Sequence, residues 1–139
     1  MEFSRKRIIK LVVTFVFLCC MLFTNFVAIR LILRYGVDTY FYDKLLVAYT
    51  FGGAEGLKLE LGKIPLTDKS PREIILAKDF TVRLKTLTDP GAFLKDKVLE
   101  SRQMIATVRN LRNVAIFIML ILFGWKLFVN HITRKKIIP

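Results

Sequence analysis

The sequence predicts a mainly α membrane protein: a two-span transmembrane helical hairpin with a small α+β extramembrane loop domain and a long C-terminal helix that continues through the membrane. Nineteen residues, 11–29, carry no charge, and a helix of about 20 apolar residues crosses a hydrocarbon core of ~30 Å. A second uncharged stretch covers residues 113–125. Apolar residues at helical spacing lead into it from Pro90, which predicts one continuous helix.

Transmembrane helix 1 is expected over residues 11–33, after a basic cytoplasmic tail over residues 1–10. A cleaved signal peptide is the alternative, but residues 25–30 contain no small-x-small cleavage pattern, which favours an uncleaved anchor. Thr14 and Asn25 share one helix face with Leu18 and Met21. We expect this face to contact another helix, because an amide is costly in lipid. Alternatively, Thr14 bonds its own backbone and Asn25 reaches the headgroups.

An extracytoplasmic loop domain is expected over residues 34–111 and begins with an aromatic stretch. Asp38 is a candidate N-cap, and apolar residues keep helical spacing after it. These features predict an amphipathic helix over about 38–50 that lies along the membrane surface, with Tyr40 and Tyr42 as interface anchors. The alternative is an ordinary core helix of the loop domain.

Two short strands are expected within the loop domain. Residues 52–56 are rich in glycine and predict a break. Apolar and charged residues then alternate over 57–61, and a similar alternation covers 80–85, which is typical of half-buried strands. Between them lie a polar turn over 65–71 and a helix start, in which Ser70 is the N-cap and Glu73 closes a capping box.

Asp89 and Pro90 predict the start of the long helix, as an N-cap followed by proline in the first turn. No proline follows until Pro139, so the helix is expected to run to about residue 132. Apolar residues recur along it at spacings of four and three, with Ser101 and Arg112 in the same row; the candidates for a partner-helix seam are Leu94, Val98, Ile105 and Val108. Intramolecular packing is the favoured use of this seam, and self-association or docking to a partner helix is the alternative.

Transmembrane helix 2 is expected over residues 112–132, before a second basic cytoplasmic tail over 133–139. Only thirteen uncharged residues precede Lys126, so its amine must snorkel to the interface, with Trp125 nearby. Trp125 and Lys126 are therefore predicted interface anchors. Asn113 and Gly124 are predicted helix–helix contacts, Asn113 at the depth of Asn25 and Gly124 near the inner face.

The net charge of +12 raises nucleic acid as a partner, but its distribution argues against one. Residues 35–112 hold 13 Lys and Arg against 10 Asp and Glu, a balance of only +3, and the remaining excess flanks the spans. The positive-inside rule then predicts an integral membrane protein, placed in a bacterial inner membrane, with both termini cytoplasmic and the loop periplasmic. The basic residues on the loop side weaken this orientation.

The sequence contains no catalytic, cofactor or metal signature. His131 has no carboxylate or cysteine spaced around it as a co-ligand. Cys19 and Cys20 are adjacent within the first span, so a disulfide between them is not expected. We therefore expect no enzyme activity, no cofactor and no metal.

Three functions fit these features. The first is a structural or accessory subunit of an envelope assembly of the secretion, conjugation or pilus type, with membrane lipid and other membrane or envelope proteins as partners and a homo-oligomer left open. The second is an immunity, exclusion or membrane-acting effector protein of a toxin or phage-conflict system. The third is a sensor, which the short cytoplasmic tails disfavour.

Overall fold

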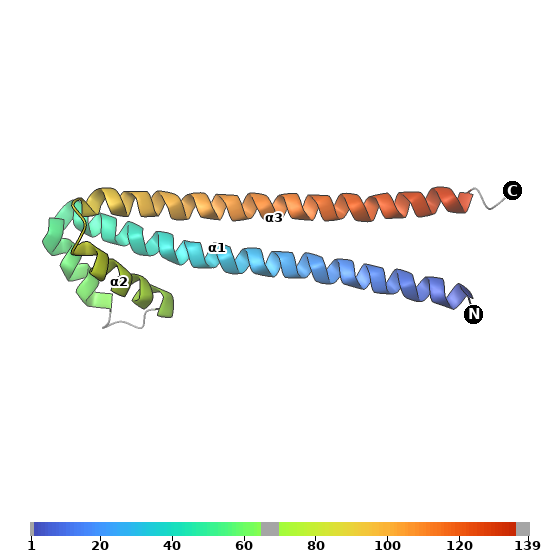
Figure 1. The fold of residues 1–139 in the computed structure, drawn as a ribbon, viewed down its shortest axis with the longest axis horizontal. Helices are drawn as coiled ribbons and strands as arrows, with labels where there is room; N and C mark the ends of the chain where they lie inside the picture. The colour runs from blue at the N-terminus through green and yellow to red at the C-terminus, as the bar shows by residue number, and fades with distance from the viewer. Residues whose placement is uncertain (1, 65–69, 136–139) are drawn as a thin grey trace. The chain divides into compact units, whose positions relative to one another are not determined.

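A computed structural model describes residues 2–64 and 70–135 of the chain. It contains three helices: α1 (Glu2–Lys63), α2 (Pro71–Leu84) and α3 (Pro90–Lys135) (Figure 1). The contacts divide the chain into two units. We call residues 1–29 with 109–139 the apolar unit and residues 30–108 the core unit.

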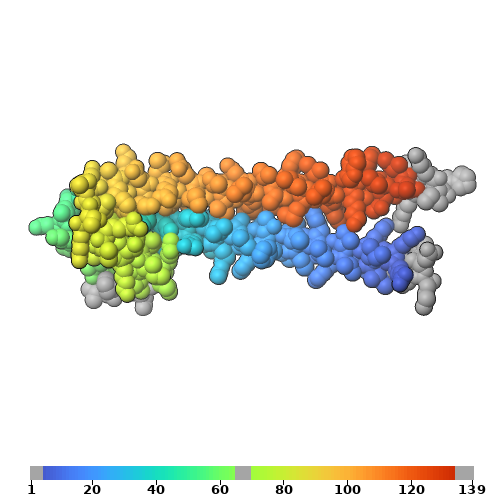
Figure 2. Space-filling view, viewed as in Figure 1, coloured from blue at the N-terminus to red at the C-terminus, as the bar shows by residue number. Residues whose placement is uncertain are grey.

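The apolar unit holds two helices that are long and apolar enough to cross a membrane, as the sequence predicts. The qualifying stretches lie within Arg5–Lys63 and Pro90–Thr133, and their apolar side chains are almost all exposed. The two helices contact each other within this unit, where the rings of Phe17 and Phe123 stack with centroids 4.5 Å apart. In Figure 2 the blue and orange-to-red side chains meet along these segments. A soluble protein would bury such surface, so an apolar solvent suits it.

The core unit is shaped by a kink at Gly53, within the glycine-rich break that the sequence predicts. Gly53 has φ 58° and ψ −147°, a conformation that is essentially confined to glycine. The chain folds back there so tightly that a Cβ on Gly56 would lie 2.5 Å from the carbonyl oxygen of Ala48. Residues 54–63 therefore pack beside the part of α1 that precedes the kink.

An ion pair joins the two sides of the kink. Lys44 Nζ lies 2.5 Å from Glu60 Oε1, and Lys63 Nζ donates to Glu60 Oε2 at 3.2 Å. The hydrogen bond from Lys44 lowers the pKa of Glu60, with a further contribution from Lys63, although partial burial acts in the opposite direction. The carboxylate is therefore ionised in the folded chain at neutral pH.

The apolar core of the core unit draws on all three helices. Phe80, Leu45, Leu57 and Leu94 have the largest side chains that are fully buried. Around them lie further buried residues from α1 to α3: Phe41, Tyr42, Ile64, Leu76 and Val98. In Figure 2 the side chains of α2 lie directly against the first turns of α3. Burying a side chain of this size stabilises the fold by about 1.5–3 kcal/mol.

The predicted α+β loop domain is wrong, because no strand occurs in the described part of the chain. Residues 57–61 belong to α1, and residues 80–84 belong to α2. Leu57 and Ile64 are buried while Leu59 is exposed, so the alternating apolar residues do not share one face as they would in a strand. Leu57 and Ile64 are seven residues apart and lie on one face of a helix. In α2 the buried pair Leu76 and Phe80 also has helical spacing.

The helix starts predicted at Ser70 and at Asp89 are confirmed. Ser70 Oγ accepts from the Glu73 backbone N–H, and the Glu73 carboxylate accepts from the Ser70 backbone N–H, which forms a complete capping box. Asp89 Oδ1 accepts from the Ala92 backbone N–H at 3.0 Å, and α3 begins at Pro90. Residues 65–69 of the predicted polar turn and residues 136–139 of the predicted basic tail lie outside the described residues.

The separate interfacial helix over 38–50 is wrong as an element. These residues continue α1 without a break, so Asp38 is not an N-cap. Phe41, Tyr42 and Leu45 face the core, which supports the alternative of an ordinary core helix.

We predict that Gly56→Ala lowers the free energy of unfolding by about 1–3 kcal/mol, because a backbone carbonyl stands where the new methyl group must go. Gly62→Ala is the matched control, since its Cβ would meet no heavy atom within 4 Å, and alanine there is expected to add about 0.5–1 kcal/mol. Thermal unfolding of the full chain in mild detergent, followed by circular dichroism, measures both. Equal effects of the two substitutions would contradict the kink geometry.

A second prediction concerns pH. Because the folded pKa of Glu60 is lowered, its stabilisation is fully present above the ordinary value of 4.5 and is lost as pH falls through the folded pKa. Wild type should therefore exceed Glu60→Gln in melting temperature at neutral pH, and the difference should shrink below pH 4.5. Glu55→Gln is the control, since Glu55 is exposed. A difference between wild type and Glu60→Gln that does not change with pH would show that the Lys44 pair contributes nothing.

Candidate binding surfaces

A polar cleft of about 420 Å³ opens between the three helices of the core unit. Its lining mixes charged, aromatic and aliphatic side chains: Tyr35, Asp38, Tyr42, Arg72, Ile75, Leu76, Asp79, Lys97, Glu100, Ser101 and Met104. Every helix contributes to it, because the kink and the two caps bring α1, α2 and α3 together. The cleft therefore lies where the three helices of the core unit meet.

Asp38 and Arg72 form the principal polar contact of this cleft. Arg72 donates from Nε to Asp38 Oδ1 at 2.8 Å and from Nη2 to Oδ2 at 2.7 Å, a two-pronged geometry that arginine suits. The contact raises the pKa of Arg72. Burial raises the pKa of the Tyr42 hydroxyl, and the negative charges of Asp38 and Asp79 raise it further. At neutral pH the tyrosine is uncharged and the ion pair is intact.

Two further polar contacts of the cleft lie within α3. Lys97 Nζ lies 2.5 Å from Glu100 Oε2, and Ser101 Oγ donates to the carbonyl of Lys97 at 2.8 Å. Across residues 2–64 and 70–135, no three His, Cys, Asp or Glu side chains lie close enough to hold a metal ion. The Asp38–Arg72 pair therefore joins α1 to α2 across the cleft, an arrangement that favours a structural role.

A second surface of the core unit is mainly apolar, unlike the polar cleft. It is an apolar groove between the last turns of α1 and the outer side of α2, formed by adjoining hollows of about 620 and 430 Å³. We call it the α2 groove and define it by its lining: Lys58, Leu61, Ile64, Ile74, Ala77, Lys78, Thr81, Val82, Leu84 and Lys85.

The charge on the α2 groove has one sign. Among the described residues, its lining contains three lysines and no acidic residue. Ile74 is 41% exposed and Val82 is 69% exposed, so stiff β-branched side chains form an open apolar wall. This combination offers a binding site for an apolar segment with acidic flanks.

The predicted seam on α3 is largely used inside the chain. Leu94 and Val98 are buried in the core, which supports the favoured intramolecular packing of these two residues and leaves them no surface for a partner helix. Ser101 is also buried, while Ile105 and Val108 are half-buried.

The predicted helix–helix contacts of the spans are placed as follows. Asn25 Nδ2 donates to its own helix at the Met21 carbonyl, 3.0 Å away. Asn113 Oδ1 accepts from the neighbouring Arg112. The two amides thus bond within their own helices. Gly124 is not a position of close approach, because a Cβ there would meet no heavy atom within 4 Å.

Thr14 lies in a hollow of the apolar unit together with Phe123 and Lys126. The ring contact between Phe17 and Phe123 was not predicted from the sequence.

The predicted interface anchors differ in exposure. Tyr40 is 61% exposed and Trp125 is 66% exposed, whereas Tyr42 is buried. Tyr42 packs edge-to-face on Phe41 with centroids 5.2 Å apart, so its role as a membrane anchor is wrong. Lys126 is exposed.

The α2 groove and the Asp38–Arg72 pair were both missed by the sequence analysis. One pattern could have indicated the groove: residues 74–77 are all apolar, more than one face of a helix can bury. The ion pair spans 34 residues of sequence and has no local pattern.

Comparison of the chain with protein-family models, with curated proteins and with solved structures finds no match.

Proposed function

We propose that the chain is a non-enzymatic integral membrane protein that serves as a structural or accessory subunit of a multiprotein envelope assembly of the secretion, conjugation or pilus type. The observation that carries this proposal is the α2 groove, an apolar surface that lies beside the core formed by the described residues of the same unit. In this proposal the apolar unit anchors the chain and the core unit binds another subunit.

The partner segment is an amphipathic helix with acidic residues beside its apolar face. The groove runs along a helix, and an apolar helix face is the usual occupant of such a surface. Lys58, Lys78 and Lys85 border the groove and would face the acidic residues of the partner. Opposite charges of this kind chiefly determine which partner binds and how fast it associates.

The membrane placement belongs to the same proposal. Arg5, Lys6 and Arg7 precede the first apolar stretch, and residues 134–136 are all basic after the second. The positive-inside rule supports cytoplasmic termini and, in a bacterial inner membrane, a periplasmic core unit. That side is where subunits of an envelope assembly would meet the groove.

The test is site-specific photo-crosslinking in the native host. A photoreactive amino acid replaces Val82 in the groove, and the same amino acid replaces Val47 as a matched control, since both valines are exposed and only Val82 lines the groove. Mass spectrometry then identifies the cross-linked peptide. We expect the Val82 probe to capture an apolar helix with acidic flanks from another membrane or envelope protein, at least tenfold more than the Val47 probe.

Three outcomes would overturn the proposal. Capture of lipid alone would assign the groove to the membrane surface. Capture of a second copy of this chain would assign it to self-association. Equal capture at positions 82 and 47 would show that the groove is not a docking surface.

A further inference from the structure

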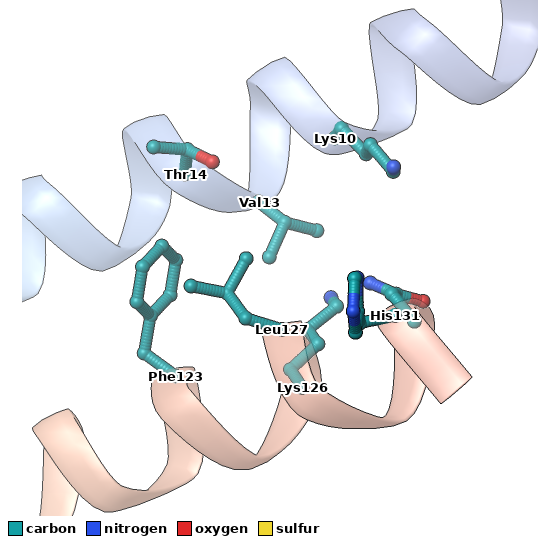
Figure 3. Close-up of a pocket in the computed structure, with 8 residues that line it drawn as sticks. Lys10, Val13, Thr14, Phe123, Lys126, Leu127 and His131 are labelled. Atoms are coloured by element: carbon teal, nitrogen blue, oxygen red, sulfur yellow. The ribbon is translucent and has the colours of Figure 1, made fainter. Parts of the chain in front are cut away.

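A second hollow lies entirely within the apolar unit. It measures about 230 Å³ and is lined by residues from both of that unit's helices: Lys10, Val13, Thr14, Phe123, Lys126, Leu127, Asn130 and His131. Figure 3 shows the Lys126 amine and the His131 ring turned into the space between the helices, with the Lys10 amine on the opposite helix. We call this hollow the basic pocket.

The charge of the basic pocket is uncompensated by acidic side chains. The sequence contains no Asp or Glu between residues 3 and 37, and none after Glu100. Two lysine amines that line one hollow repel each other when no anion lies between them. The protein supplies no carboxylate from its lining, so the arrangement favours an anion from outside.

The walls of the pocket indicate what else the ligand carries. Val13, Leu127 and Phe123 form an apolar side, and Lys10, Lys126, Asn130 and His131 form a polar side. Asn130 adds an amide donor, and His131 adds a ring N–H. A ligand that satisfies both sides has an anionic head and a hydrocarbon tail.

We infer that the basic pocket binds a phosphate group, supplied by the headgroup of an anionic phospholipid. The two lysines bind the phosphate oxygens as point charges, and the first acyl carbons lie against the apolar side. Free inorganic phosphate shares the head chemistry but offers nothing to that side. The inference rests on the membrane location proposed above, and it does not depend on any partner at the α2 groove.

The test is lipid titration of the purified full chain in mild detergent, followed by native mass spectrometry. Phosphatidylglycerol is the anionic probe, and phosphatidylcholine is the zwitterionic control. We expect phosphatidylglycerol to bind at least tenfold more tightly. Lys10→Gln and Lys126→Gln should each weaken it roughly tenfold, the equivalent of one charge-assisted hydrogen bond.

The matched control is Arg5→Gln. It removes one positive charge from the same tail but lies outside the pocket, and it should change phosphatidylglycerol affinity less than twofold. Circular dichroism of each variant confirms that helix content is retained. Equal affinity for the two lipids, or an Arg5→Gln effect as large as those of the lysine variants, would overturn the site.

A competition arm identifies the source of the phosphate. Inorganic phosphate is added to the chain loaded with phosphatidylglycerol. Retention of the lipid supports the headgroup, whereas its displacement at equal concentrations would overturn the lipid assignment. Because the purified chain contains no envelope partner, either result is independent of the crosslinking experiment on the α2 groove.

Discussion

The core unit depends on the reversal of α1 at Gly53. A helix that continued straight would carry Leu57 and Ile64 away from Leu45, and the core would lose the residues that close it. The reversal needs a backbone conformation open essentially to glycine at position 53 and a residue without a Cβ at position 56. Lys44 and Glu60 then hold the two sides together. The backbone conformation of Gly53 and the missing Cβ of Gly56 thus decide whether this segment forms a unit or an extended helix.

The two units use charge in opposite ways. In the core unit Asp38 with Arg72, and Glu60 with Lys44, join segments that are distant in sequence. Such pairs fix which segments meet, whereas the apolar core supplies most of the stabilisation. In the apolar unit Lys10 and Lys126 have no acidic residue within seven positions in the sequence. In the proposed lipid site, phospholipid phosphate supplies the counter-charge of these two lysines.

Helix ends were predictable from sequence because they depend on a few adjacent residues. Ser70 with Glu73, and Asp89 with Pro90, each determine a helix start within one turn. The strands were wrong because alternation over five residues also fits a helix with i, i+4 and i+7 contacts, and only the tertiary fold decides between them. The seam on α3 was recognised as a pattern, but a pattern does not say whether the chain itself or a partner covers it.

The α2 groove could not be predicted from the sequence, because it also depends on the tertiary fold. Its lining comes from residues 58–64 and from residues 74–85, and these segments meet because α1 turns back. The position of Tyr42 also could not be predicted from the local sequence. An aromatic residue near a span suits the membrane interface, but Tyr42 lies in the core with Phe41 and Leu45. Sites built from distant segments need the fold before they can be found.

The reversal of α1 at Gly53 creates the surface of the core unit. The most direct measurement is the distance between spin labels at positions 40 and 59, in the full chain with Cys19 and Cys20 replaced by serine. Both positions are exposed in the wild-type chain, and they lie on either side of the kink. A continuous helix would separate them by ~28 Å at 1.5 Å per residue. The reversal predicts a distribution centred well below that value, and a distribution centred near ~28 Å would contradict it.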